Sequence, residues 1–405
     1  MPNKANKVLY IIITGGVISG IGKGIASASI GKLLNSNLKI VPMKLDGYLN
    51  VDPGTMNPIE HGEVFVLDDG GEVDMDFGHY ERFLNINCKI DQNLTMGKIF
   101  DHVRKKERKG DYLGKTVQFI PHVTDTIKEK IYSVAKNESA DVMLIEVGGT
   151  VGDIENELYI EAIRQMKKEV GEENIIYVHL TYVPIPTGVN EQKSKPTQQS
   201  VNMLRQRGIQ PDIIICRSEK IINEKLKEKI SLFCDVDKNA VISGVDVNNV
   251  YSIPFKFEEE GLSEIIHKKL RIYSPPNLSE WRILLNNLNR LEHELNIAIC
   301  GKYTDLEDSY ASINEALMHC SANTKTKINL KFIETTELEN QNNNTEDILN
   351  NFDGVIIPGG FGNRGTEGKL EVIKYCRENK IPTLGICLGL QLMVVEYARN
   401  ICNLE

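Results

Sequence analysis

The segment Thr14-Gly15-Gly16-Val17-Ile18-Ser19-Gly20-Ile21-Gly22-Lys23-Gly24 is the most informative part of the N-terminal half of the chain. It follows a short β-branched run at residues 8–14 and leads into a helical pattern at residues 23–34. Glycines let the backbone wrap around phosphate oxygens, N–H groups at the helix start supply donors, and Lys23 neutralises charge. A strict Walker A motif has glycine where Val17 stands and Ser or Thr where Gly24 stands. We interpret the stretch as a phosphate-binding loop; the alternative is a tight glycine turn that closes a βα unit.

Similar short apolar runs recur outward from this loop, at residues 41–45, 142–147, 175–181 and 212–216. Helical patterns, for example at residues 155–170 and 198–207, separate several of them. Strands that are buried on both faces and alternate with helices are typical of a mostly parallel α/β sheet. The sequence therefore predicts an α/β fold.

The pattern breaks at Ser274-Pro275-Pro276-Asn277, and a charged amphipathic helix is predicted from Glu280 to about Glu294. A second α/β series follows, with strands expected at residues 295–300, 354–357 and 383–386 and a helix at 388–399. We therefore predict a domain at residues 1–275, a linker helix at 276–294 and a second domain at 295–405. The second sheet would end on an uncovered edge, so this domain is expected to be incomplete.

The composition narrows the class of protein. The chain has 405 residues, 41% hydrophobic and 25% charged, which excludes a disordered or collagen-like chain. The net charge of −9 argues against non-specific nucleic-acid binding, and the apolar runs are too short to span a membrane. Eight cysteines without a C-x-x-C pair favour reduced thiols in a cytoplasmic protein.

Charged residues gather where the predicted strands end. Lys44 ends the second strand, Glu146 ends another, and Asp74 and Asp76 lie in a loop bounded by glycine. Ligands of open α/β sheets bind at such strand ends, and carboxylate oxygens suit Mg²⁺. Taken singly, each is more typical of a solvated charge. Together with a phosphate loop, the acids predict a metal site.

A second candidate site centres on Cys387, in the segment Gly385-Ile386-Cys387-Leu388-Gly389 between a predicted strand and a helix. Such a sharp turn exposes a nucleophile, and N–H groups at a helix start favour a thiolate. The glycine turn at 358–362 could form an oxyanion hole, with Gly360 as its donor. The alternative is a small core cysteine.

Several long motifs in this order resemble the CTP synthase family of glutamine-dependent amidotransferases. They are GGVISGIGKG, KLDGYLNVDPGTMNPIEHGEVFV, DMDFGHYERF, GDYLGKTVQFIPHVT, EVGGTVGDIE and KSKPTQQSV, followed by PGGFGNRG and GICLGLQL. The resemblance covers essentially the whole chain. It implies an N-terminal P-loop-like amidoligase domain with a parallel sheet, followed by an incomplete class I glutamine amidotransferase α/β domain.

The resemblance implies that ATP phosphorylates O4 of UTP and that ammonia, derived from glutamine, displaces the phosphate to give CTP. Lys23 and Lys44 would act on the transferring phosphoryl group, and Asp76 and Glu146 would hold Mg²⁺. The implied ATP-binding residues are Ser19, Gly20, Ile21, Gly22, Lys23, Gly24 and Asp76. Those for UTP or CTP are Ser19, Asp153, Ile154, Glu155, Lys193, Ser194, Lys195, Pro196, Thr197, Gln198 and Lys229. Those for glutamine are Gly360, Leu388, Gly389, Leu390 and Gln391, with Cys387 as nucleophile.

The resemblance also implies a homotetramer, GTP as an activator, CTP as a feedback inhibitor and an ammonia tunnel with His61 near its narrow part. No nucleic-acid or membrane partner is expected. Two departures from the family pattern, Gly20 for serine and Gly47 for proline, are expected to loosen their loops. No histidine follows Cys387 in the sequence, although the family has a His-x-Glu base motif downstream. We interpret the sequence as a fragment; the alternative is a protein that has lost glutaminase activity.

Two other functions compete. A different ATP-dependent amidoligase, such as cobyrinic acid diamide synthase, shares both parts but lacks the KLDGYLNVDPGTMNP and KSKPTQ blocks. A regulatory or assembly subunit would explain the missing base, but it has no need of Lys23, Lys44, Asp76 and Glu146.

Overall fold

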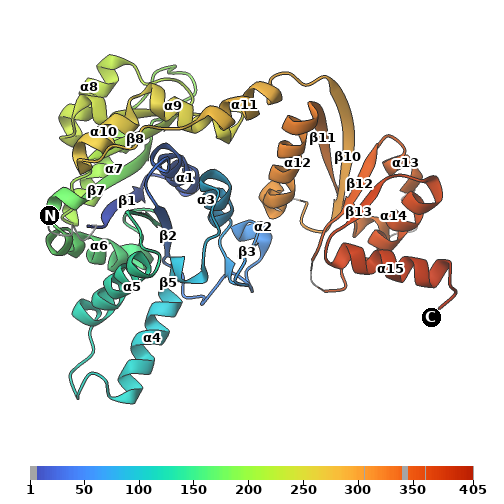
Figure 1. Ribbon diagram of the computed structural model, residues 1–405, viewed down its shortest axis with the longest axis horizontal. Coiled ribbons are helices and arrows are strands. Elements are labelled where there is room, and N and C mark those ends of the chain that lie inside the picture. The colour runs from blue at the N-terminus through green and yellow to red at the C-terminus, as the bar shows by residue number, and fades with distance from the viewer. Residues whose placement is uncertain (1–6, 305, 340–344, 361, 405) are drawn as a thin grey trace. The chain divides into compact units, whose positions relative to one another are not determined.

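The computed structural model describes residues 7–304, 306–339, 345–360 and 362–404. The chain forms two compact units. The first comprises Met1–Thr55 and Phe65–Ser279, and the second comprises Met56–Val64 and Glu280–Glu405 (Figure 1).

A seven-stranded parallel sheet forms the centre of the first unit, in the order β5-β2-β6-β1-β7-β8-β9. Its strands are β1 (Leu9–Gly15), β2 (Ile40–Asp46), β5 (Asn93–Thr95), β6 (Val142–Val147), β7 (Ile175–Tyr182), β8 (Ile213–Ser218) and β9 (Val241–Val245). A short antiparallel pair, β3 (Phe65–Val66) and β4 (Glu72–Val73), lies outside this sheet. The parallel α/β fold is confirmed for this unit.

Helices cover both faces of the sheet (Figure 1). The helices of the unit are α1 (Lys23–Leu34), α3 (Asp76–Leu84), α4 (Met96–Lys109), α5 (Thr124–Asn137), α6 (Glu157–Val170), α7 (Lys195–Gln206), α8 (Glu224–Cys234), α9 (Ile253–Glu259) and α10 (Leu262–Leu270). Side chains alternate along each strand, so Ile11 and Ile13 join the core under α1, whereas Tyr10 and Ile12 join the core under α5 and α6. Burial on both faces explains why these strands read as continuous apolar runs.

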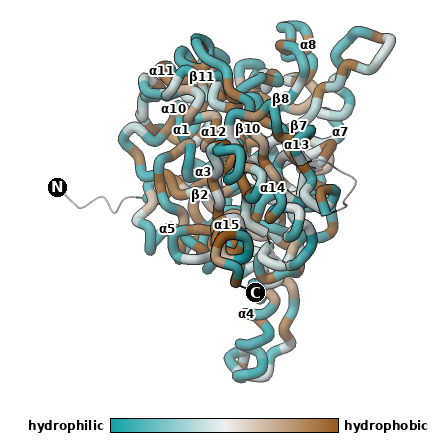
Figure 2. The backbone as a smooth tube through the Cα atoms, turned by 90° about the vertical axis from the view of Figure 1, so that its right-hand side faces the viewer, coloured by the Kyte–Doolittle hydropathy of each residue, from teal (hydrophilic) through white to brown (hydrophobic). Residues whose placement is uncertain are grey.

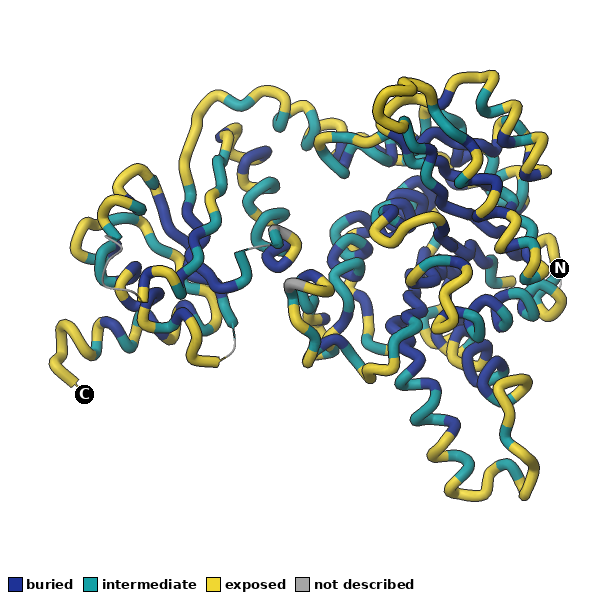
Figure 3. The backbone as a smooth tube through the Cα atoms, turned by 180° about the vertical axis from the view of Figure 1, so that it is seen from behind, coloured by how far each residue is buried: buried dark blue, intermediate teal, exposed yellow. Residues whose placement is uncertain are grey.

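The second unit has a four-stranded parallel sheet in the order β11-β10-β12-β13. Its strands are β10 (His293–Gly301), β11 (Thr326–Glu334), β12 (Gly354–Ile357) and β13 (Thr383–Gly385). Its longer helices are α12 (Ala311–Thr324), α14 (Thr366–Asn379) and α15 (Leu388–Asn400), with the short α13 (Thr345–Leu349). The helix α15 carries hydrophobic stretches (Figure 2) and both buried and exposed stretches (Figure 3). On this helix, Leu390, Val394 and Tyr397 are exposed.

The segment 56–64 belongs to the second unit, although the sequence places it inside the first predicted domain. It contains the one-turn helix α2 (Pro58–His61), and the carboxylate of Glu63 accepts hydrogen bonds from the N–H (2.9 Å) and hydroxyl (2.7 Å) of Ser312. The predicted linker helix is also shorter than expected. It is α11 (Ser279–Leu288), and β10 already begins at His293.

Within the described residues, no helix combines the length and apolar character that a membrane crossing requires. The tip that follows α4, residues 110–118, is largely exposed (Figure 3).

Candidate functional site

The predicted phosphate loop connects β1 to α1, at the carboxyl end of the central strand. Gly20 and Gly22 have φ of 66° and 90°, so both adopt left-handed backbone that glycine tolerates. Val17 has φ of 78°, which is strained for a β-branched residue. This is the position where a Walker A motif has glycine, the residue that tolerates such a backbone conformation best. Gly20 suits this left-handed backbone, and a Cβ at residue 20 would meet no atom within 4 Å.

Two buried polar residues, which no local sequence pattern indicated, support this loop. A Cβ on Gly16 would lie 1.7 Å from Oγ of Ser200, so the loop packs directly on α7. His179 on β7 lies between Oγ1 of Thr14 and Oγ of Ser200, at 2.8 Å from each. Burial, with a smaller effect of Lys23, lowers the pKa of His179 to about 3, so its ring is neutral at pH 7.

Lys23 begins α1 and is almost fully buried, with 8% of its surface exposed. Its ammonium group donates a hydrogen bond to the carbonyl oxygen of Gly149 (2.7 Å), which lies just after β6. The lysine is therefore held at the start of the helix, next to the strand end that carries Glu146.

Lys44 on β2 lies among carboxylates. Its Nζ is 2.5 Å from Oδ2 of Asp76, 2.8 Å from Oδ1 of Asp74 and 3.7 Å from Oδ1 of Asp46. Burial alone would lower the pKa of Lys44, but these carboxylates outweigh it and raise the pKa well above its ordinary value. Burial raises the pKa of Asp74 to about 6, whereas the Lys44 ammonium overcomes the same effect at Asp76 and lowers its pKa to about 2.

Glu146 lies directly opposite Lys44 in the register of β6 and β2. It accepts hydrogen bonds from the hydroxyl groups of Tyr80 and of Ser27 (3.4 Å). Burial, reinforced by the charge of Asp76, raises the pKa of Glu146 to about 8. The structure thus brings together Lys23, Lys44, Asp76 and Glu146, as the sequence predicted for one site.

The carboxylate oxygens of Asp76 and Glu146 fit a hard divalent cation. A Cβ on Gly24 would lie 1.9 Å from Oδ1 of Asp76, so the helix start and this carboxylate are in close contact. The described residues contain no group of three or more His, Cys, Asp or Glu side chains that could hold a metal on their own. Mg²⁺ commonly takes one or two carboxylates and completes its shell with water and phosphate oxygens. A Glu146 that resists ionisation without a cation is consistent with such a site.

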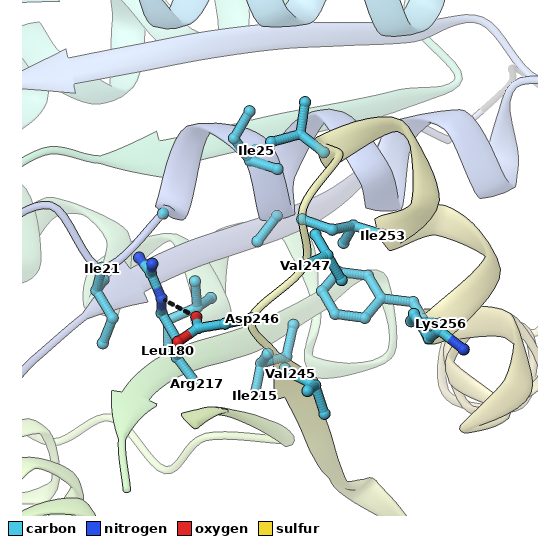
Figure 4. A pocket seen from close by; sticks show the side chains of 15 residues that line it. Ile21, Ile25, Leu180, Ile215, Arg217, Val245, Asp246, Val247, Ile253 and Lys256 are labelled. Carbon is cyan, nitrogen blue, oxygen red and sulfur yellow. Dashed lines mark hydrogen bonds and ion pairs between the residues drawn. The ribbon is translucent and has the colours of Figure 1, made fainter. Parts of the chain in front are cut away.

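An apolar pocket adjoins the phosphate loop, and sequence reasoning missed it. It is lined by Ile21, Gly22 and Ile25, by the ends of β8 and β9, and by α9 (Figure 4). Arg217 closes one side, because its guanidinium pairs with Asp246 (2.9 Å) and donates to the carbonyl oxygen of Gly20 (3.1 Å). A slot with apolar walls beside a phosphate loop can hold a flat ring whose phosphates reach the loop.

The predicted pyrimidine-pocket residues Asp153, Ile154 and Glu155 are exposed, beyond the end of β6. Asp153 accepts a hydrogen bond from the N–H of Thr150 (2.7 Å), which fixes this turn. A Cβ on Gly47 would lie 3.1 Å from the carbonyl carbon of Glu155. Glycine at residue 47 thus permits close packing of two loops, whereas the sequence predicted only a looser one.

The predicted triphosphate residues divide into lysines that line an open pocket and a more buried group. Lys193, Lys195 and Lys229 line one open pocket together with Lys225, which the sequence analysis missed. Thr197 is fully buried, and its hydroxyl lies 3.0 Å from that of Thr181. Ser194 and Gln198 are buried and bonded to each other (3.0 Å), while Pro196 is half-buried. The lysines can therefore meet an anion, and the buried residues shape the start of α7.

Cys387 lies on a sharp turn between β13 and α15. Its φ of 53° and ψ of −112° are strained for a residue with a Cβ, and its side chain is exposed. This strained, exposed conformation is that of a nucleophile elbow and excludes the alternative of a core cysteine. Leu388 and Gly389 begin α15 in half-buried and buried positions, whereas Leu390 and Gln391 are exposed.

The glycine turn at 358–362 lies beside this elbow, because β12 pairs with β13 and Ile357 is in register with Gly385. Phe361 lies outside the described residues. A Cβ built on Gly359 would be 3.8 Å from Sγ of Cys387. Gly360 has φ of 145°, a conformation that side chains other than glycine rarely adopt. The turn therefore lies close enough to Cys387 for the predicted oxyanion hole to form there.

Family models match both parts of the chain. Residues 9–272 match the family model described as CTP synthase N-terminus, and residues 305–405 match glutamine amidotransferase class-I. The CTP synthase of Borreliella afzelii is 54% identical over 398 residues, which cover 97% of this chain and 74% of that protein. That of Carboxydothermus hydrogenoformans is 52% identical over 398 residues, covering 98% and 74%. A solved glutaminase domain of Trypanosoma brucei CTPS with bound acivicin is 37% identical, covers 26% of this chain and 41% of that one, and gives a TM-score of 0.26.

Proposed function

The chain belongs to the CTP synthase family of glutamine-dependent ligases, and from this premise we propose that it aminates UTP through a phosphorylated intermediate. ATP gives its γ-phosphoryl group to O4 of UTP and leaves as ADP. Ammonia then adds at C4, and the departing phosphate carries the former O4. The observation that carries this proposal is the cluster of Lys23, Lys44, Asp76 and Glu146 beside the phosphate loop.

Each member of this cluster has a proposed task. The backbone of residues 19–24 cradles the phosphates, and Lys23 and Lys44 stabilise the charge that spreads over the transferring group. Asp76 and Glu146 would hold Mg²⁺, which neutralises phosphate charge when bound. Lys44 forms an ion pair with Asp76 (2.5 Å), and in this proposal the lysine exchanges that carboxylate for a phosphate oxygen when ATP binds.

The nucleotides are assigned to two different regions. We place the base of ATP in the apolar pocket that Arg217 closes, since this pocket continues from the phosphate loop at Gly22. The triphosphate of UTP, or of CTP as feedback inhibitor, is assigned to Lys193, Lys195, Lys225 and Lys229. The turn 153–155 would read the pyrimidine, and a homotetramer would share these sites between subunits. A GTP activator and a cytoplasmic location, consistent with eight free cysteines, complete the proposal.

The second unit is proposed to release ammonia from glutamine. Cys387 attacks the amide carbon, its oxygen takes up negative charge, and N–H groups such as that of Gly360 bind this oxygen. Leu388, Gly389, Leu390 and Gln391 would bind glutamine. A cysteine nucleophile also needs a general base to take its proton. We propose that ammonium salt can replace glutamine as the nitrogen source, because the amination site of the first unit does not depend on Cys387.

The test is the ultraviolet change from UTP to CTP, measured on one preparation with ATP, Mg²⁺ and either nitrogen source. Formation of CTP with ammonium salt is expected, and its absence in a folded preparation would contradict the proposed amination. ATP hydrolysis in the presence of ammonia is expected to require UTP. If it proceeds equally well without UTP, another amidoligase function is correct instead.

A further inference from the structure

Lys369 on α14 is a buried cation to which the proposed mechanism gives no role. Only 1% of its surface is exposed. Its Nζ donates hydrogen bonds to the carbonyl oxygens of Pro358 (2.9 Å) and Gly359 (3.3 Å), and no carboxylate in the described part of the chain forms an ion pair with it. Burial lowers the pKa of Lys369 to about 8. Burying a cation without a counter-ion opposes folding, so its contacts with these two carbonyl groups need an explanation.

Both carbonyl groups belong to the glycine turn that faces Cys387. The carbonyl of Gly359 and the N–H of Gly360 form one peptide group, and in a trans peptide they point in opposite directions. Because Lys369 binds that carbonyl from the buried side, the N–H of Gly360 is directed away from the lysine. A peptide between two glycines rotates easily, since neither residue has a Cβ. Lys369 is thus the anchor that selects one orientation of this peptide.

The orientation matters because the turn is in contact with the nucleophile. A Cβ on Gly359 would lie 3.4 Å from Cβ of Cys387 and 3.8 Å from its Sγ. If the peptide rotated, the Gly359 carbonyl would leave Lys369 and could turn its negative end toward the sulfur. Lys369 binds the carbonyl of Gly359, and Gly359 is itself in contact with Cys387, so one residue separates the ammonium group from the sulfur. The lysine is therefore placed to act on this site through the backbone and through its charge.

We propose that Lys369 is a positioning residue for the proposed glutaminase site. It fixes the Gly359–Gly360 peptide so that the N–H of Gly360 serves the oxyanion, and its buried charge stabilises negative charge at Sγ of Cys387. The proposal rests on the proposed role of Cys387 as nucleophile, and the experiment distinguishes a failure of that role from a failure of the role of Lys369.

The test measures alkylation of each cysteine in the 405-residue chain by mass spectrometry of its peptides. In this reaction the thiolate sulfur displaces iodide, forming an S–C bond as the C–I bond breaks. Cys320 and Cys402 are exposed and serve as reference thiols, whereas Cys300 and Cys376 are buried and react only if the second unit opens. Two reagents are compared, neutral iodoacetamide and anionic iodoacetate.

Lys369→Met removes both the hydrogen bonds and the charge, and Lys374→Met makes the same change at a half-buried position of α14. In Lys369→Met we expect alkylation of Cys387 by iodoacetamide to slow by about fivefold to tenfold, from the loss of a nearby cation and ordered donors. The ratio of the iodoacetate rate to the iodoacetamide rate should fall by about threefold, because a positive charge favours the anionic reagent. Lys369→Arg, which keeps charge and donors, should restore much of both.

The outcomes separate the hypotheses. If Cys387 in the unmodified chain reacts no faster than Cys320 and Cys402, the proposed nucleophile is wrong. If Cys387 is faster but neither its rate nor the reagent ratio changes in Lys369→Met, the role of Lys369 is overturned. If Cys300 and Cys376 become reactive, Lys369→Gln replaces the first variant, with the same expectations. Should that variant also open the unit, Lys369 is needed for folding and not for positioning, and the proposal fails.

Discussion

The phosphate loop of the first unit and the cysteine elbow of the second lie at the same kind of place, the carboxyl end of a parallel strand, yet they prepare for chemistry in opposite ways. The first site contains several charged side chains, and its single residue Lys44 forms ion pairs with Asp76, Asp74 and Asp46. The second presents one exposed, strained residue, Cys387, beside a glycine turn. Phosphoryl transfer requires many charges to be neutralised, whereas acyl transfer requires one nucleophile and a few donors. The location on the sheet is therefore shared, and the chemistry comes from the residues placed there.

The largest effect is expected from Lys23→Ala. Removing the cation that Gly149 holds at the start of α1 should raise the barrier to phosphoryl transfer by several kcal/mol, roughly 10³-fold or more in rate. CTP formation should fall to this extent with every nitrogen source that supports it. Near-normal turnover of the purified variant would remove Lys23 from the site. The matched control is Lys32→Ala, in the last turn of the same helix.

Cys387→Ala should sharpen the comparison, because only one of the two sites should respond. CTP formation from ammonium salt should stay within about twofold, since the phosphate loop and its lysines do not depend on the thiol. Cys402→Ala, at another exposed thiol, provides the control. Loss of ammonium-dependent activity in Cys387→Ala alone would show that the two sites are not separable in this way.

Asp76→Asn and Glu146→Gln test the metal site. Each should weaken Mg²⁺-dependent turnover by about tenfold or more while leaving folding intact, because carboxylates placed for a cation repel each other in its absence. Glu219→Gln, at an exposed acid, is the control. If the turnover of a variant depends on Mg²⁺ concentration as that of the unmodified chain does, the substituted residue is not a Mg²⁺ ligand.

The same site gives a pH dependence of known sign. Burial raises the pKa of Glu146 to about 8, so near neutral pH the carboxyl is largely protonated until a cation displaces the proton. The rise in melting temperature produced by Mg²⁺ with a non-hydrolysable ATP analogue should therefore increase from pH 6 to pH 9. In Glu146→Gln this increase should be much smaller. An equal increase in both proteins would contradict the assignment of Glu146.

The smallest effect concerns His179 beneath the phosphate loop. The pKa of His179 is about 3 in the folded chain and about 6.5 in the unfolded chain. Below pH 6.5 the unfolded state therefore binds one proton more than the folded state, and the free energy of unfolding decreases as the pH is lowered. From pH 7 to pH 5 this group should reduce the free energy of unfolding by about 2 kcal/mol. His179→Gln should flatten this slope in urea titrations of the first unit, whereas His293→Gln, at an exposed site, should not. Equal slopes in all three proteins would mean that His179 is not buried as a neutral ring.

The sequence predicts those features that depend on a single residue type or on the local spacing of apolar residues. The α/β fold and the family resemblance are confirmed, and α1, β6 and β12 begin and end where the pattern predicts. The roles of the candidate site residues stay predictions. Contacts between distant segments could not be predicted, because a local pattern does not reveal which buried polar residues meet. His179 and Ser200 beneath the loop and Lys369 beneath the glycine turn are of this kind. The sequence shows that Val17 departs from the Walker A motif, but only the structure shows that its backbone is strained.

The membership of residues 56–64 in the second unit bears on how this protein can be divided. A gene cut at the linker helix would yield residues 280–405 without α2 and without the Glu63 carboxylate that binds the N–H and hydroxyl of Ser312 near the start of α12. Such a fragment would leave that end of the helix without its acceptor. For the same reason, a protease that cleaves only between α10 and β10 would leave the two products joined through the 56–64 insertion. Dissection therefore has to follow the packing of the chain and not the order of its residues.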